Sequence, residues 1–299
     1  MADISVLDVL GGPKNIKDAV ARAIANAATE AEEFDRQESI GAYEGRSIAA
    51  VFQTEIGEQN IWTWLQGRVR AGNFAGLRIG DWIDVQITEG TNVPAQTVRY
   101  RIYAIDPYYK AADQEKGHHL VMGPTSPVTV QGSKAVNGSY LPWRTTNDNN
   151  GTAAEKHPYL LSTLHDWEIN DFLPSLPSEV QAVIMTQRVL LNERYSSSSK
   201  LTDDSGWSWA DIGKIWSPSE IEVYGFRAWS GPYCAGFDCQ FPIFKQTKDR
   251  IMGNRFTWWL RSVSGSSSSY VCYVHSSGSA SSYVPTFDWF RPRPCFLVG

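Results

Sequence analysis

The chain carries histidine, cysteine and acidic residues whose spacing could bind a metal ion or support catalysis. His118 and His119 are adjacent, and a strand directs adjacent side chains to opposite faces, so the two imidazoles cannot easily bind one ion. We expect one to be packed and the other exposed. The sequence contains no HExxH, Gly-x-Ser-x-Gly, P-loop or dinucleotide-binding motif. These residue types therefore do not predict an enzyme.

The four cysteines fall into two pairs along the chain. Cys234 and Cys239, in CAGFDC, are close enough to bridge or to share a metal, but the gap is not that of a zinc knuckle and no histidine flanks it. Free thiols in a loop are the favoured interpretation. Cys272 and Cys295 lie near the end of the chain. The sequence leaves open whether either pair forms a disulfide.

Acidic residues cluster in three places, where their oxygens could hold calcium. These places are Asp203 with Asp204, Asp166 with Glu168, and TNDNN around Asp148. The spacing of an EF-hand is absent, and turns use the same residue types for hydrogen bonds to the backbone. We therefore predict no metal and no cofactor, with calcium as an alternative that no motif supports.

Composition narrows the class of protein. The 299 residues carry a net charge of −5 without a basic block, so nucleic acid is a poor candidate for a partner. No run of about 18 apolar residues predicts a membrane span. The first residues lack the basic and apolar regions of a secretory signal, which favours a soluble protein made in a cytoplasm. The content of 12 Trp, 13 Tyr and 12 Phe suits an aromatic core or a recognition surface.

The sequence predicts two parts of the chain, residues 1–60 and residues 61–299. Residues 15–37 predict a helix rich in Ala. Its apolar stripe consists of Ile16, Val20, Ile24, Ala27 and Ala31. The stripe could pack on its own domain, self-associate or dock on a larger assembly. The glycine-containing SIGAYEGRS then breaks the helix, and we interpret residues 1–60 as an attachment or oligomerisation segment.

The second part predicts short elements joined by long loops. A short helix is expected from Ile61, followed by a strand at 82–87 and a second strand through YRIYAI that ends at Asp106-Pro107. Val98, Tyr100, Ile102 and Ala104 alternate along the second strand, which predicts that it is half-buried. These two strands are expected to form an antiparallel hairpin, with HHLVMGP as a third strand. Ser162 can cap a helix, and Pro177-Ser178 can open another helix or a helix-to-strand unit. The pattern predicts an α+β fold.

Residues 258–296 combine large anchoring residues with a filling of Ser, Tyr and Gly. A Ser/Gly-rich stretch alone predicts a flexible linker. Here, however, the Ser/Gly-rich stretch follows the large residues Trp258, Trp259 and Leu260, and a segment rich in Pro and Phe comes after it. Within the stretch, YVCYV has the alternating pattern of a strand. Tyr provides contact area at low entropic cost and Ser and Gly provide adaptable fit, so a binding surface is the better interpretation.

The same residues carry a family resemblance. FTWWLRSVSGSSSSYVCYVHSSGSAS followed by FRPRPCFLVG resembles the closing signature of phage and prophage proteins of the DUF6273 type. FAGLRIGDWIDV, YRIYAIDPYY, HHLVMGP and the run into the signature extend the resemblance over 61–299. Trp289-Phe290 stands where the family usually has Gly-Val, so the turn at this position is expected to differ from that of the family.

The resemblance implies a C-type-lectin-like fold with short antiparallel strands, few helices and long ordered loops. It extends to variable proteins of diversity-generating retroelements and to phage tropism determinants. Mutated Asn codons in such segments do not yield Lys, Glu, Gln or Met, and none of these four occurs from Val263 to Phe290. The Glu-Pro-Asn, Gln-Pro-Asp and Trp-Asn-Asp triplets of calcium-dependent sugar binding are absent, so the resemblance does not imply that activity.

The resulting hypothesis is a receptor-binding adhesin of a phage or prophage, not an enzyme. The expected buried frame is Trp258, Trp259, Leu260, Arg261, Arg291, Pro292 and Phe296, with both arginines holding loop carbonyls or a carboxylate. The expected contact residues are Ser266, Ser268, Tyr270, Tyr273, His275, Ser282, Tyr283, Phe287, Asp288 and Trp289.

The expected partners are a bacterial surface receptor, protein or glycan, and other virion or tail proteins bound through the N-terminal segment. A homo-oligomer is expected, with the trimer of tropism determinants as one form, displayed on the virion. Two alternatives stay open. One is an enzyme on the related formylglycine-generating fold, or a glycan hydrolase, which would need a reactive cysteine pair or two carboxylates that flank a cleft. The other is a structural virion decoration protein.

Overall fold

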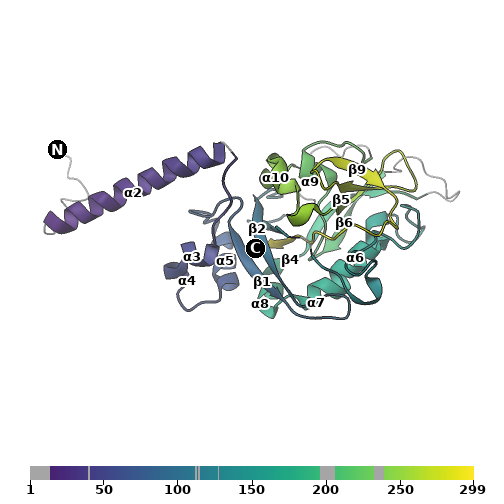
Figure 1. Ribbon diagram of the computed structural model, residues 1–299, viewed down its shortest axis with the longest axis horizontal. Helices are drawn as coiled ribbons and strands as arrows, with labels where there is room; N and C mark the ends of the chain where they lie inside the picture. Colours follow the sequence, from purple (N-terminus) through teal and green to yellow (C-terminus); the bar gives the residue numbers. More distant parts are fainter. Residues whose placement is uncertain are drawn as a thin grey trace. The chain divides into compact units, whose positions relative to one another are not determined.

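The computed structural model describes residues 14–39, 41–111, 113, 115–126, 128–195, 206–231 and 239–299 (Figure 1). The chain divides into two compact units, Met1–Glu44 and Gly45–Gly299. Cys234, Asp203 and Asp204, which the sequence singled out, lie outside the described residues. Within the described residues, no helix is both long enough and apolar enough to cross a membrane.

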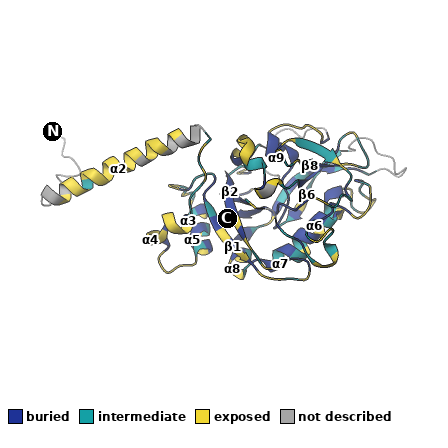
Figure 2. Ribbon diagram, in the orientation of Figure 1, coloured by how far each residue is buried: buried dark blue, intermediate teal, exposed yellow. Residues whose placement is uncertain are grey.

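The first unit consists of one described helix, α2 (Lys14–Ser39), which confirms the helix expected over 15–37. Its described side chains are almost all exposed, including Ile16 and Ile24, which are 48% and 61% exposed. Figure 2 shows this helix largely in the colour of exposed residues. An ion pair joins Arg36 to Glu33 on its surface.

The second unit begins before the boundary at residue 61 that the sequence suggested. Residues 45–60 contain α3 (Ile48–Val51) and α4 (Gln53–Ile56), and they contribute the buried side chains of Ile48, Phe52 and Ile56 to its core. The helix α5 (Ile61–Arg70) follows, as expected. Its cap is Asn60, whose Oδ1 accepts a hydrogen bond from the Trp62 amide at 2.8 Å.

A five-stranded antiparallel sheet contains both early and late parts of this unit. Its strand order is β1 (Trp82–Ile87), β2 (Gln96–Ile105), β3 (Leu120–Pro124), β10 (Phe296–Val298) and β4 (Ile184–Met185). The expected hairpin of β1 and β2 is present, with Val85 opposite Val98. The last strand of the chain thus lies between β3 and β4, and this position anchors the C-terminal segment in the first sheet.

One strand is more deeply buried than its sequence pattern indicates. The alternating residues Val98, Tyr100, Ile102 and Ala104 of β2 are buried as expected, but Tyr103 on the opposite face is buried as well. Its ring lies 5.0 Å from that of Phe244, centroid to centroid. The half-buried strand of the prediction is therefore covered on both faces.

Short helices connect the sheets. They are η1 (Gly132–Lys134), η2 (Pro158–Leu161), α6 (Thr163–Trp167), the π-helical turn η3 (Glu168–Phe172), α7 (Leu173–Ser175) and α8 (Ser178–Val183). The cap expected at Ser162 is present, since its hydroxyl accepts from the His165 amide at 3.0 Å. The helix-to-strand unit expected after Pro177 is also present, as α8 followed by β4.

The remaining elements form two further antiparallel sheets and the helices beside them. One sheet pairs β5 (Gln187–Glu193) with β6 (Gly206–Gly213), and the other has the order β7 (Trp258–Val263), β8 (Val271–Val274) and β9 (Ala280–Tyr283). The helices are α9 (Glu220–Tyr224), η4 (Pro242–Lys245), α10 (Thr247–Arg250) and η5 (Gly253–Arg255). The fold is therefore a mixed α+β fold with antiparallel sheets, as the sequence predicted at that level.

Candidate binding surface

The Ser/Tyr-rich segment is an ordered three-stranded sheet with its connecting loops, in yellow in Figure 1. It starts in β7, and the chain then returns to the first sheet through β10. Residues opposite one another in antiparallel strands point to the same face, and the register pairs Trp259 with Tyr273 and Val271 with Tyr283. Tyr273 and Tyr283 therefore share a face, whereas Ser282, opposite buried Cys272, points to the other.

The residues expected to form the frame are buried. Trp258, Trp259, Leu260 and Phe296 are fully buried, and Arg261 is 3% exposed. Indole nitrogens hold neighbouring loops, since Trp259 Nε1 donates to the Leu141 carbonyl at 2.7 Å. Pro292 lies in the buried run 290–299 at the end of the chain.

The two arginines of the frame have different partners. Arg261 donates to the Ser217 carbonyl at 3.1 Å and to the carboxylate of Glu222, as the sequence led us to expect. Arg291 instead donates to two hydroxyls, Thr129 Oγ1 at 3.2 Å and Ser139 Oγ at 2.7 Å. Its guanidinium also lies 4.2 Å from the centroid of the Phe256 ring, a cation–π contact. The expectation of a carbonyl or carboxylate partner was therefore right for Arg261 and wrong for Arg291.

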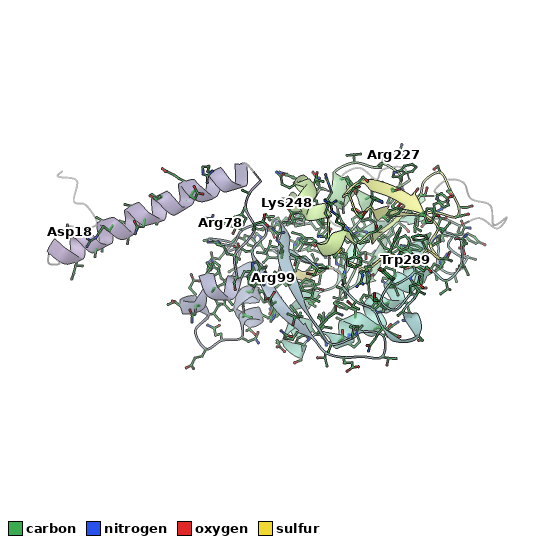
Figure 3. The ribbon with its side chains drawn as sticks, in the orientation of Figure 1. Asp18, Arg78, Arg99, Arg227, Lys248 and Trp289 are labelled. Carbon is green, nitrogen blue, oxygen red and sulfur yellow. The ribbon has the colours of Figure 1, made fainter. Side chains whose placement is uncertain are left out.

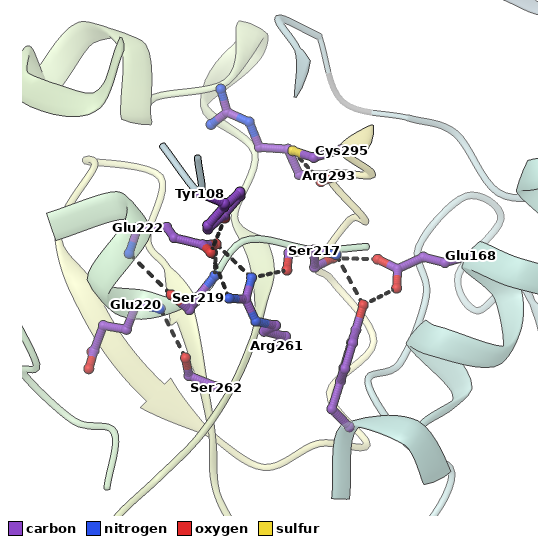
Figure 4. A network of polar contacts seen from close by, with 11 residues as sticks. Tyr108, Glu168, Ser217, Ser219, Glu220, Glu222, Arg261, Ser262, Arg293 and Cys295 are labelled. Atoms are coloured by element: carbon purple, nitrogen blue, oxygen red, sulfur yellow. Dashed lines mark hydrogen bonds and ion pairs between the residues drawn. The ribbon is translucent and has the colours of Figure 1, made fainter. Parts of the chain in front are cut away.

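A buried polar network surrounds Arg261 (Figure 4). Glu222 receives two hydrogen bonds from this arginine, and the Tyr108 hydroxyl donates to the same carboxylate. Glu222 also closes a capping box with Ser219 at the start of α9. Because the carboxylate is fully buried, these donors compensate the loss of its water contacts.

Glu168 is a second buried carboxyl group, next to the network around Arg261 and Glu222. Its carboxyl accepts from the Tyr159 hydroxyl and, at 2.6 Å, from Ser217 Oγ. Burial is the largest influence on this group and raises the pKa of Glu168 to about 8. The sequence suggested this residue as a calcium ligand or a turn residue, and its complete burial shows that it is a core group instead.

Glu220 connects the buried network to the surface. Its carboxylate accepts from the amides of Ala228, Trp229 and Ser230, at 2.9 to 3.1 Å for the shortest contact of each. Its own amide donates to Ser262 Oγ at 2.9 Å, next to the frame arginine. A single buried carboxylate thus fixes the loop that carries the exposed Trp229.

The Ser-rich loop, residues 264–270, is held mainly through its carbonyl groups. Asn149 Nδ2 donates to the carbonyls of Ser267, at 2.8 Å, and Tyr270, and the Asn149 amide donates to that of Ser268 at 3.0 Å. The guanidinium of Arg194 donates to the carbonyls of Ser264 and Ser267. Both donors are buried and lie far outside the loop in sequence. The path of the loop is therefore held largely from outside, although Ser264 Oγ and Ser267 Oγ also accept from the amides of Ser266 and Ser269 at 3.4 and 3.2 Å.

Other parts of the segment are held in the same manner. Leu141 and Arg144 donate their amides to the carbonyls of Phe290 and Pro285. Trp229 Nε1 donates to the Ala280 carbonyl at 3.2 Å, and the Tyr224 hydroxyl donates to that of Gly278 at 3.1 Å. Nothing in the sequence identified Asn149, Arg194 and Glu220 as the groups that hold this surface. Asn149 lies in TNDNN, which was considered only for calcium or a turn, and Arg194 and Glu220 belong to no motif.

Three exposed or half-exposed rings form a surface that we call the aromatic ridge: Tyr270, Tyr283 and Phe287. The rings of Tyr270 and Tyr283 stack with their centroids 6.1 Å apart, and Phe287 meets Tyr283 edge to face at 4.8 Å. Phe287 in turn contacts buried Phe290 at 4.9 Å, and Phe290 contacts Trp259 at 4.3 Å. The exposed rings are thereby fixed on the buried frame.

The structure brings some of the expected contact residues together and separates others. Tyr273 packs beneath the ridge, 4.5 Å from Phe290, and is half-buried. Trp289, labelled in Figure 3, is 55% exposed and contacts Tyr140 at 5.3 Å. His275 is exposed, but it lies in the turn at the opposite end of the β8–β9 hairpin from Tyr283.

The exposure of all ten expected contact residues is as follows. Five of them are exposed: Ser266, Tyr270, His275, Tyr283 and Trp289. The other five are partly exposed: Ser268, Tyr273, Ser282, Phe287 and Asp288. The carboxylate of Asp288 accepts from Asn137 Nδ2 at 2.7 Å. Ser266 and Ser268 lie in the same loop as Tyr270 of the candidate surface, whereas Ser282 faces the other side of the hairpin.

An open hollow of about 510 Å³ borders the Ser-rich loop. Its lining consists of Arg227, Ala228, Trp229, Ser230, Gly265 and Ser266. The Gly265 amide donates to the Trp229 carbonyl at 2.9 Å, so the two sides of the hollow are hydrogen-bonded to each other. An indole, a guanidinium and hydroxyls in one hollow suit a partner with both apolar and polar groups.

The residues considered for metal or thiol chemistry lie elsewhere. Among the described residues, no group of three or more His, Cys, Asp or Glu side chains could hold a metal. Cys295 is a buried free thiol, so it forms no disulfide with Cys272, and burial raises its pKa. The histidine pair separates as expected. His119 is fully buried, whereas His118 is partly exposed with Nδ1 2.5 Å from Asp106 Oδ2.

Comparison with known proteins gives one match. No curated protein and no solved structure is significantly similar to the chain. Residues 133–299 match a family described as Domain of unknown function (DUF6273). The match includes β7 to β9, the Ser-rich loop and the whole frame, and it covers more than half of the chain. The chain therefore belongs to the DUF6273 family.

Proposed function

We propose that this protein is a ligand-binding adhesin that presents the aromatic ridge, Trp289 and the hollow beside Trp229 to a bacterial surface receptor. The proposal extends to a phage or prophage origin, display on the virion and attachment through the N-terminal segment. These parts rest on the resemblance of the closing signature to phage and prophage proteins. A C-type-lectin-like arrangement of the second unit belongs to the same proposal.

One observation carries the binding function. The Ser-rich loop is held through carbonyl groups by Asn149 and Arg194, both outside the segment. These contacts do not depend on the side chains of Ser266 and Tyr270, which are exposed. A surface of this kind can change its side chains while the fold stays the same, as proteins with variable binding surfaces require.

The chemistry of the exposed residues supports the same function. Tyr and Trp contribute large contact areas with few rotatable bonds, and the fixed rings of the ridge lose little further freedom when a partner binds. Serines beside them offer hydroxyl donors and acceptors without steric bulk. Contacts among Tyr270, Tyr283 and Phe287 also prevent the ridge from collapsing into a different arrangement.

The enzyme alternative has less support. A formylglycine-generating type of chemistry needs a reactive thiolate, whereas Cys272 and Cys295 are both fully buried. Burial also favours the protonated thiol of Cys295 by raising its pKa. Binding therefore explains the exposed residues better than thiol chemistry does.

A binding experiment tests the proposal. The probe is the labelled full-length protein, added to cells of the bacterium that carries the gene, with bound protein measured by flow cytometry. The test variant combines Tyr270→Ser, Tyr283→Ser and Trp289→Ser. Central aromatic residues of an interface each contribute more than about 1 kcal/mol, so we expect at least a tenfold loss of affinity, roughly. Tyr273 is kept because it packs against Phe290.

A matched control uses an exposed tyrosine that is not part of this surface. Tyr109 lies in the turn after β2 and is 40% exposed, close to the values for Tyr270 and Tyr283. Tyr109→Ser should bind the cells as the parent does. Equal binding by the parent and the triple variant, with both folded by circular dichroism, would show that the surface is assigned wrongly.

Sequencing of the gene in a bacterial population tests variability without knowledge of the receptor. If the segment is diversified, changes should concentrate in codons for exposed residues such as Ser266 and Tyr283. Codons for Arg261, Asn149 and Arg194 should stay constant. An even spread of changes between exposed and buried codons would contradict diversification of this surface.

A further inference from the structure

The helix α2 carries an apolar stripe and a separation of charge that suggest its partner. We infer that α2 pairs with α2 of a second copy of this chain in antiparallel orientation. The pairing does not depend on what the ligand-binding surface recognises. It would join two copies by a two-fold axis.

The first argument is exposure. Ile16 and Ile24 are 48% and 61% exposed, and Val20 between them is only partly covered. A single helix of 26 residues has marginal stability in water, because most helical stability in proteins comes from packing of an apolar face. Covering the stripe with another helix would stabilise α2.

The second argument is the order of basic and acidic residues along α2. Residues 14–22 contain three basic residues and one acidic residue, whereas residues 30–38 contain five acidic residues and one basic residue. This order opposes the helix macrodipole, which favours acidic residues at the N-terminus and basic residues at the C-terminus. The order of charges is therefore unfavourable within α2 itself, and a neighbouring helix with the opposite order would compensate it.

An antiparallel copy provides that compensation. It places the basic half of each helix beside the acidic half of the other, whereas parallel helices would place like charges side by side. This argument favours a two-fold pair over the parallel trimer that the resemblance suggested. Two identical charge contacts result, one at each end of the pair.

The stripe is complementary to itself in this orientation. With the two-fold axis placed between the levels of residues 25 and 26, Val20 comes opposite Ala31 and Ile24 comes opposite Ala27. Val20 and Ile24 thus each meet an alanine, which lets the helix axes approach closely in the middle of the pair. In the same register the position of Lys17 comes beside that of Asp35 on the same flank of the pair.

Sedimentation velocity and light scattering of the full-length chain test this inference. The parent should have twice the chain mass of 33.4 kDa. Ile24→Glu should reduce the mass to that of one chain. Its control is Ala25→Glu on the opposite face of α2, which is also exposed and should leave the mass unchanged.

Charge reversal determines the orientation. One variant combines Lys14→Glu with Lys17→Glu, and a second combines Asp35→Lys with Glu38→Lys. Each variant by itself should no longer self-associate. An equal mixture of the two variants should associate, because only a mixed pair places opposite charges side by side at both ends of the helix pair. Both variants bring α2 into agreement with its macrodipole, so a weaker isolated helix cannot explain a loss.

Three results would overturn the inference: a parent that is monomeric at every concentration, a mass of three chains, or charge-reversed variants that associate as well as the parent. A parallel pair predicts the last result. In a parallel pair, charge reversal replaces a contact between two basic segments by a contact between two acidic segments, or the reverse, so like charges face each other before and after the change. None of these measurements involves a receptor, so they leave the proposed binding function unaffected.

Discussion

Arg261 and Glu222 form a buried ion pair through two hydrogen bonds, from Arg261 Nη1 to Glu222 Oε2 at 2.6 Å and from Arg261 Nη2 to Glu222 Oε1 at 2.6 Å. Their side chains are 2% and 0% exposed. The pair joins β7, which opens the Ser/Tyr-rich segment, to α9. It therefore connects the candidate binding surface to the core.

Removing the charge of Glu222 should destabilise the protein strongly. Glu222→Gln leaves the guanidinium of Arg261 buried without a compensating charge, and we expect the free energy of unfolding to fall by about 3–5 kcal/mol. Urea denaturation measures the change.

An exposed ion pair that also has two hydrogen bonds provides the control. Arg99 Nε and Nη2 donate to the two oxygens of Asp84 at 2.8 and 3.0 Å, but the side chains are 44% and 37% exposed. Asp84→Asn should therefore cost less than about 1 kcal/mol. Equal costs at the two sites would contradict the importance assigned to burial.

The carboxyl group of Glu168 should make stability depend on pH. Its pKa is raised from 4.5 to about 8 in the folded protein, so between these values the folded state binds a proton that the unfolded state has released. The stability from this group is complete below about pH 4.5 and is lost as the pH rises through 8. The slope in this window approaches −1.4 kcal/mol per pH unit, roughly.

Glu168→Gln removes the titrating group while it keeps the size of the side chain. The difference in unfolding free energy between parent and variant should shift in favour of the variant as the pH rises from 5 to 8. Urea titrations at several pH values measure that difference. A constant difference across this range would mean that Glu168 is already ionised in the folded protein.

The donors that hold the Ser-rich loop should matter more than its exposed side chains. Asn149→Ala removes the side-chain donor to the carbonyls of Ser267 and Tyr270, and we expect a loss of about 1–3 kcal/mol. Hydrogen exchange of amides 264–270 should accelerate. Ser268→Ala in the loop itself should stay within about 0.5 kcal/mol of the parent. The reverse order would show that the loop depends on its own side chains.

Gly278 is required by the turn between β8 and β9. Its φ of +82° is unfavourable for other residues, and a Cβ there would lie 3.2 Å from side-chain carbons of Ile251 and Thr247. Gly278→Ala should cost more than about 1 kcal/mol. Gly138 has a similar φ, of +85°, but nothing lies within 4 Å of its Cβ position, so Gly138→Ala should cost less. Thermal unfolding of both variants makes the comparison.

Local patterns in the sequence predicted the elements that depend on local interactions. Alternation of apolar residues located β1 and β2, the hydroxyl of Ser162 marked the start of α6, and Pro177 marked the unit of α8 and β4. In each case neighbours within a few residues determine the backbone. The burial of the frame followed from the size of Trp258 and Trp259.

Long-range polar contacts were beyond the reach of the sequence. Asn149 Nδ2 bonds to the Tyr270 carbonyl across 121 residues, and Arg194 bonds to the Ser264 carbonyl across 70. Neither donor has a periodic or spaced partner that would reveal it. Glu168 looked like a turn residue because a single carboxylate gives no sign of burial. The second covered face of β2 was missed because it depends on packing from η4.

The carbonyl contacts of the Ser-rich loop have a practical consequence for protein engineering. Because Asn149 and Arg194 hold the main chain from outside, positions such as Ser266, Ser268 and Tyr270 are suited to simultaneous randomisation in a display library. Such a library would test for new specificities on a scaffold that orders the randomised loop through these hydrogen bonds. The donors, rather than the randomised residues, are what the designer must keep.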